Sequence, residues 1–84
     1  MTNAFTFANK CRQASDDFSS INVGRMLGAD DWFKCYTIEV EAADACGLAL
    51  QAAKRIGEPA YVIKEWQDAV DLHLAFASAA KSHL

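Results

Sequence analysis

The apolar positions near the start of the chain repeat with the spacing of a helix face. Between residues 4 and 21, apolar residues recur at alternating intervals of three and four positions, at Ala4, Phe7, Cys11, Ala14, Phe18 and Ile21. This heptad pattern is typical of a helix with one buried seam. Asn3 precedes it, and its side-chain oxygen can accept a free first-turn N–H. We predict a helix over about residues 4–22.

Two glycines then interrupt the pattern. Gly24 and Gly28 flank a short segment, and the next seam position after Ile21 would fall on Arg25. We therefore expect a loop here. Asp30 and Asp31 follow it, and short carboxylates are favoured both as N-caps and near the positive end of a helix.

The next segment favours one long helix over about residues 31–56, since it lacks proline and has the single glycine Gly47. Its apolar residues form two stripes instead of one. The first stripe contains Trp32, Cys35, Ala42, Cys46, Ala49, Ala53 and Ile56, and the second contains Phe33, Tyr36, Val40, Ala43, Gly47 and Leu50. We expect a chain with three helices to cover only one of these faces fully.

A clear boundary ends this helix. Gly57 suits a left-handed C-cap, and Pro59 suits the first turn of a further helix. The third helix is predicted over about residues 59–82. Its apolar face contains Val62 or Ile63, Trp66, Val70, His73, Phe76 or Ala77, and Ala80.

The predicted fold is therefore all-α, with three helices in a single helical domain over residues 1–84. The helices can form an antiparallel bundle or open to assemble with other copies, and the pattern does not decide between these packings. A domain of this length buries only about 60% of its unfolded surface. We accordingly expect a homo-oligomer.

Composition narrows the classes of function. The chain is 52% hydrophobic, but no apolar run reaches the roughly 18 residues of a membrane span, so we expect no transmembrane segment. The formal net charge is −3 and the basic residues are scattered, which argues against nucleic-acid binding. The first ten residues do not resemble a secretion signal, so the expected location is the cytoplasm.

The residues that could carry chemistry are dispersed. Cys11, Cys35 and Cys46 form no C-x-x-C pair, and no cysteine or histidine pair has zinc-ligand spacing. The acidic pairs are expected to be caps or solvated surface, and nucleophile-elbow, phosphate-loop and metalloprotease motifs are all missing from the sequence. We predict no enzyme activity, no cofactor and no metal site. His73 is expected in the core or at an interface, with one hydrogen-bond partner.

Three further segments of the chain share features with a known family, and they run over residues 39–45, 52–56 and 58–67. In these segments, which lie within residues 32–84, the chain resembles the phasins, helical proteins that coat polyhydroxyalkanoate storage granules in bacteria. They share with that family a long alanine-rich amphipathic helix, a short break containing a proline, a hydrophobic pair and a second amphipathic helix. Trp66 departs from the pattern, since the family more often has an aliphatic residue there.

The resemblance implies a non-catalytic granule coat that controls granule size and number. Amphipathic helices with broad, weakly hydrophobic faces can cover one another and also open onto an apolar surface. The expected interaction face contains Trp32, Phe33, Tyr36, Val40 and Leu50 in the second helix, and Val62, Ile63, Trp66, Val70 and Phe76 in the third.

Two other functions remain open. A small helical protein-binding module, such as a regulator or inhibitor, would use the same face and the acidic ridges on one protein partner. A cofactor-binding bundle would use His73 and the thiols. The two tryptophans, Trp32 and Trp66, fit either core packing or an anchor at an apolar–aqueous boundary.

Overall fold

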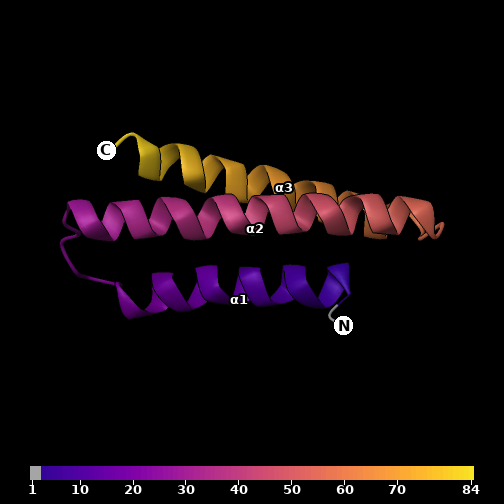
Figure 1. The fold of residues 1–84 in the computed structure, drawn as a ribbon, viewed down its shortest axis with the longest axis horizontal. Coiled ribbons are helices and arrows are strands. Elements are labelled where there is room, and N and C mark those ends of the chain that lie inside the picture. The colour runs from indigo at the N-terminus through magenta and orange to yellow at the C-terminus, as the bar shows by residue number, and fades with distance from the viewer. Residues whose placement is uncertain (1–2) are drawn as a thin grey trace.

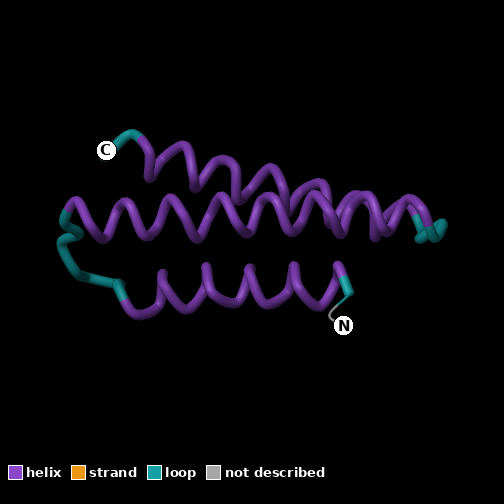
Figure 2. The backbone as a smooth tube through the Cα atoms, viewed as in Figure 1, coloured by secondary structure: helices purple, strands orange, loops and turns teal. Residues whose placement is uncertain are grey.

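A computed structural model describes residues 3–84 and contains three α-helices over that range, with no strand (Figures 1 and 2). They are α1 (Ala4–Ile21), α2 (Ala29–Arg55) and α3 (Ala60–Lys81). The all-α prediction is confirmed, and each observed boundary lies within two residues of the predicted one. No helix in this part of the chain is long and apolar enough to cross a membrane.

Helix α2 lies between the other two and is antiparallel to both (Figure 1). Both α1 and α3 pack along α2, whereas no Cα atoms of α1 and α3 lie within 8 Å of each other in residues 3–84. The molecule measures 43 × 25 × 18 Å along its principal axes. The packing is that of a three-helix bundle in which α2 is the shared central element.

Local hydrogen bonds account for where the helices begin and end. Asn3 caps α1, since the Thr6 N–H donates to its Oδ1 at 2.8 Å. The N-cap of α2 is Gly28 instead of either aspartate, and Asp31 acts from the first turn, where its Oδ2 accepts the Gly28 N–H at 3.0 Å. A capping residue can therefore sit inside the helix when its side chain reaches back.

The C-terminus of α2 has the cap that its glycine predicts. Gly57 has φ +75°, its N–H donates to the Lys54 carbonyl, and the Glu58 N–H donates to the Ala53 carbonyl. These two bonds define a Schellman motif, which requires a left-handed residue that glycine adopts at low cost. Pro59 occupies the N-cap of α3.

The core consists mostly of alanine. The buried apolar residues are Ala8, Ala42, Ala43, Ala45, Cys46, Ala49, Leu50, Ala53, Ala69, Ala77 and Ala80. Small side chains let helix backbones approach closely, so the bundle is held by tight contact between helices more than by large interlocking side chains. Both apolar stripes of α2 contribute to this core, because α1 and α3 cover different sides of the helix.

The predicted seam of α1 is only partly correct. Ala8 and Ser15 are buried against α2, whereas Phe7, Ala14 and Ile21 of the predicted seam are exposed. Its other members, Ala4, Cys11 and Phe18, are half-buried. Ala8 belongs to the same buried cluster as Ala45 and Cys46. A residue larger than alanine at position 8 would hold α1 and α2 apart. Close packing of these helices therefore favours burial of the α1 face that carries Ala8 over the face that carries Phe7.

Candidate functional site

A chain of buried polar side chains links all three helices. Ser15 of α1 donates a hydrogen bond from its Oγ to Oε1 of Glu39 in α2. His73 of α3 lies with its Nδ1 2.8 Å from the other carboxylate oxygen, Oε2. Each of the three residues is only 3% exposed. Because a carboxylate accepts hydrogen bonds, we assign the shared proton to Nδ1 of His73.

The order of the three side chains in this hydrogen-bonded series determines its chemistry. In a nucleophilic triad the hydroxyl bonds to the imidazole, which is oriented in turn by an acid. Here Glu39 stands in the middle, and Ser15 bonds to the carboxylate instead of to His73. The arrangement therefore positions helices, since a shift of α1 or α3 along α2 would leave a buried carboxylate with a missing partner.

The free nitrogen of His73 has an apolar setting. Its Nε2 is buried and has no hydrogen-bond partner among the described residues. The Phe76 ring meets the imidazole edge to face, with centroids 6.1 Å apart. The prediction of a core histidine with one hydrogen-bond partner is confirmed.

Sequence reasoning did not identify Ser15 and Glu39 as the residues that share a buried hydrogen-bonded series with His73. Glu39 could have been noticed, because it precedes Ala42 by three residues and Cys46 by seven and so lies in their apolar stripe. Ser15 had no comparable signal, since it is a polar residue that lies outside the predicted seam.

The expected interaction face is mostly turned inward. Phe33 and Phe76 are exposed, at 62% and 46% of their surface, and Leu50 is buried. The other seven residues are half-buried, namely Trp32, Tyr36, Val40, Val62, Ile63, Trp66 and Val70. The structure thus places these residues largely between helices.

Both tryptophans contact other aromatic rings. Trp66 of α3 packs against Phe5 of α1 with ring centroids 6.0 Å apart, which joins the two outer helices. Trp32 stacks on His83 near the C-terminus, with centroids 3.8 Å apart and planes 4° from parallel. The indole of Trp32 is therefore covered on one face by the end of the same chain.

Many large apolar residues outside the predicted face are exposed, and sequence reasoning did not select them. They are Phe7, Ile21, Val23, Met26, Leu48, Ile56, Tyr61, Leu72, Leu74 and Leu84. The most exposed is Met26, at 96%, in the loop that joins α1 to α2. A core that consists mostly of alanine is therefore accompanied by many exposed large apolar side chains.

An open groove runs between α2 and α3. Its lining is mostly apolar and consists of Ala43, Asp44, Gly47, Leu48, Gln51, Val70 and Leu74. An added Cβ at Gly47 would meet no atom within 4 Å, so the glycine leaves open space in the wall.

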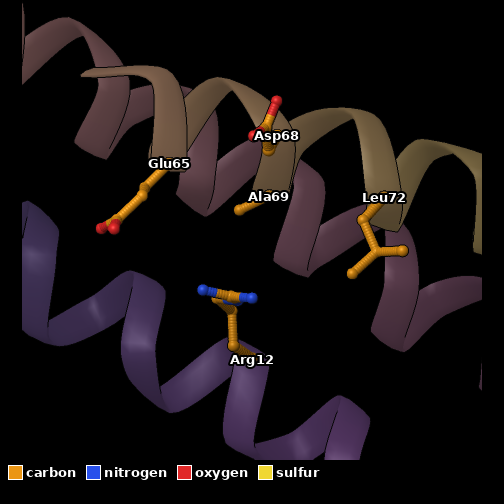
Figure 3. Close-up of a pocket in the computed structure, with 5 residues that line it drawn as sticks. All are labelled: Arg12, Glu65, Asp68, Ala69 and Leu72. Carbon is orange, nitrogen blue, oxygen red and sulfur yellow. The ribbon is translucent and has the colours of Figure 1, made fainter. Parts of the chain in front are cut away.

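A second groove separates α1 from α3. Arg12 extends into it from α1, and Glu65, Asp68, Ala69 and Leu72 line the opposite side on α3 (Figure 3). No ion pair joins Arg12 to either carboxylate within residues 3–84. The groove is open, and three of its five lining residues are charged.

The three thiols are free, and burial raises the pKa of each. A nearby carboxylate adds to the rise in two of them, Glu41 for Cys11 and Glu39 for Cys35. A raised pKa favours the protonated thiol, which is a weak nucleophile. Within residues 3–84, no cluster of three or more histidine, cysteine or acidic side chains could hold a metal ion.

Comparison of the chain with models of protein families, with curated proteins and with solved structures gave no match.

Proposed function

We propose that this protein is a non-catalytic coat protein that adsorbs to hydrophobic surfaces through its exposed apolar side chains. The observation that supports the proposal is the set of twelve large apolar side chains that are exposed in residues 3–84, around a core that consists mostly of alanine. Transfer of the protein's exposed apolar side chains out of water is favourable. Adsorption to an apolar material requires little shape complementarity.

The resemblance to the phasins suggests which surface this is. We propose a polyhydroxyalkanoate granule in the cytoplasm, reached through residues 32–84. Phe33 and Phe76 are available for this contact in the closed bundle. The half-buried members of the face, such as Trp32 and Val62, become available when α2 and α3 separate on the surface.

The test uses particles of polyhydroxybutyrate and of a second hydrophobic polymer. Loss of protein from solution measures binding, tryptophan emission reports Trp32 and Trp66, and circular dichroism reports helix content. We expect saturable binding to both particles, a changed emission and retained helicity. No depletion by either particle would contradict the proposal.

Matched variants locate the contact. Phe33→Glu and Phe76→Glu should each weaken binding by roughly tenfold or more, since burying a phenylalanine contributes about 1.5–3 kcal/mol. Gln67→Glu is the control, because it adds the same charge at an exposed polar position. An equal loss in the control would assign the effect to charge alone.

A second candidate function is a small protein-binding module that acts on one partner. The loop after α1 favours it, since Ile21, Val23 and Met26 expose apolar side chains close together in the sequence. An exposed apolar loop of this kind can insert into a single pocket of a partner protein. This function predicts a stoichiometric complex that Met26→Ser weakens, together with no adsorption to either particle.

A further inference from the structure

The aromatic stack of Trp32 on His83 lies at the end of the bundle where α2 and α3 are not connected. Trp32 is near the start of α2, and His83 follows the last residue of α3 by two positions. The turn that joins the two helices, residues 56–59, lies at the opposite end of the pair (Figure 1). Because this short turn keeps that end together, α2 and α3 can separate only from the end that carries the stack.

The backbone places His83 on the side of α3 that faces α2. Its N–H donates to the Ala80 carbonyl at 3.1 Å, and the Leu84 N–H donates to the Lys81 carbonyl at 3.0 Å. The chain therefore keeps turning beyond the helix, and His83 lies one turn beyond Ala80, which is fully buried. Side chains three positions apart share a helix face, so the imidazole extends the buried stripe of α3.

Few other contacts hold this end of the helix pair closed. The buried residues of α3 nearest to the stack are alanines, whose side chains bury little apolar area. The nearest side-chain hydrogen bond between α2 and α3 in residues 3–84 is that of Glu39 with His73. Glu39 is seven residues from Trp32, or about 10 Å along α2 at 1.5 Å per residue. Any opening from this end must therefore break the stack first.

We infer that the stack of His83 on Trp32 is an autoinhibitory contact that keeps the interaction face closed until the protein reaches an apolar surface. The inference rests on the proposed function, in which half-buried residues of that face become available when α2 and α3 separate. The ring centroids are 3.8 Å apart and the planes are 4° from parallel, so the imidazole covers one face of the indole. Release of His83 exposes Trp32 first and then Tyr36, which lies one turn further along α2.

The strength of the stack allows a surface to displace it. Loss of a contact between two aromatic rings changes an equilibrium by roughly two- to tenfold. Phe33, the neighbour of Trp32, is already 62% exposed and can contact an apolar material before the stack opens. Transfer of the released indole from water to that material then replaces the lost contact with His83.

Fluorescence of the free protein tests the contact without any particle. All proteins in this test carry Trp66→Phe, so that Trp32 is the single tryptophan. His83→Ala should increase acrylamide quenching of Trp32 and move its emission to longer wavelength, because the indole gains contact with water. Leu84→Ala is the control, since it shortens the adjacent exposed side chain. Unchanged quenching in His83→Ala, or an equal change in Leu84→Ala, would overturn the inference.

Hydrogen exchange measures how often this end opens. In His83→Ala the backbone amides of residues 77–81 should exchange roughly two- to tenfold faster, because the open fraction rises by the factor that the stack contributes. Amides in the middle of α2 should exchange at the same rate in both proteins. Equal rates at residues 77–81 would show that the stack does not hold the end of α3 closed, and would overturn the inference.

Adsorption to polyhydroxybutyrate particles tests the regulatory role in the chain with both tryptophans. His83→Ala should adsorb roughly two- to tenfold faster than the unaltered protein, since more molecules are open. His83→Phe keeps a ring that can stack on Trp32 and should adsorb no faster than the unaltered protein, although it is the more apolar variant. Faster adsorption of His83→Phe than of His83→Ala would assign the effect to apolar content and overturn the autoinhibitory role.

The two kinds of measurement separate the possible failures. If no protein leaves solution, the coat function is contradicted and the autoinhibitory role falls with it. If the unaltered protein adsorbs but His83→Ala changes neither Trp32 quenching nor the rate of adsorption, the coat function stands and the inference about His83 is overturned.

Discussion

Glu39 is the residue at which the three helices meet. A carboxylate in an alanine core loses its hydration, and only specific partners offset that cost. Ser15 and His73 supply those partners, one on each side. The stability of the bundle therefore depends on this side chain more than its small volume suggests.

Replacement of Glu39 measures that dependence. Glu39→Ala should lower the free energy of unfolding by about 2–4 kcal/mol, since it leaves two buried polar side chains unpaired. Glu39→Gln should cost less, because its amide can still accept from His73. Urea denaturation followed by circular dichroism gives both values. Glu41→Ala, at an exposed position of the same helix, is the control, and equal small losses in all three would contradict the assigned role of Glu39.

Cys46 predicts how stability depends on alkaline pH. Burial raises the pKa of this thiol above its usual value of 9.0; Arg12 opposes the rise, and Cys11 adds to it. The folded protein therefore holds this proton more tightly than the unfolded chain. The resulting stability is fully present below pH 9.0 and is lost as pH rises through the higher folded pKa.

The measurement is urea denaturation at a series of pH values from neutral to strongly alkaline. The free energy of unfolding should fall in the alkaline range, and Cys46→Ala should flatten the fall while lowering stability at neutral pH. Cys11 and Cys35, whose pKa values are also raised, are present in both proteins and cancel in the comparison. An identical alkaline slope in the variant would contradict the prediction.

Features that depend on one residue and its neighbours in sequence could be predicted. Asn3 caps α1, Gly57 ends α2, and His73 is buried with one partner, as the sequence indicates. The partners of His73 could not be predicted. They come from α1 and α2, and their meeting depends on the register of helix pairs, which a single helical pattern does not contain.

At the scale of the element, α1 shows how packing can override a hydrophobic pattern. The heptad through Phe7 is regular, yet the helix turns Ala8 toward α2. Periodicity identified the helix and its length correctly. It could not choose the buried face, because that choice depends on how closely the neighbouring helix approaches.

Two substitutions test whether the Ala8 face or the Phe7 face of α1 is buried against α2. Ala8→Leu should destabilise the fold by about 1–3 kcal/mol, since the added side chain has no room against Ala45 and Cys46. Phe7→Ala should cost less than about 1 kcal/mol, because the ring is about half exposed. Thermal or urea denaturation measures both. A larger loss for Phe7→Ala than for Ala8→Leu would show that the heptad seam faces the core.

At the scale of the whole molecule, α2 is the scaffold and α1 is the more weakly held helix. Helix α2 is contacted on two sides, whereas the backbone of α1 meets only α2. The sequence left open whether the helices form a bundle or an open assembly. That choice depends on contacts between residues far apart in the chain, such as Phe5 with Trp66.

Hydrogen exchange tests this order of stability. Backbone amides in α1 should exchange through partial opening at a lower free energy than those in the middle of α2, because fewer contacts must break. Mass spectrometry or NMR of the exchanging protein resolves the two helices. Exchange of α1 and α2 at one common free energy would mean that the bundle opens only as a unit.

The alanine core also determines how the fold responds to temperature. The heat capacity of unfolding grows with the apolar surface that becomes hydrated, and each buried alanine contributes little such surface. Twelve large apolar side chains in residues 3–84 are already exposed to water in the folded state and add little more. We expect calorimetry to give a heat-capacity change below the usual ~12–15 cal/mol/K per residue. The resulting stability curve is shallow, so the bundle loses little of its stability on cooling.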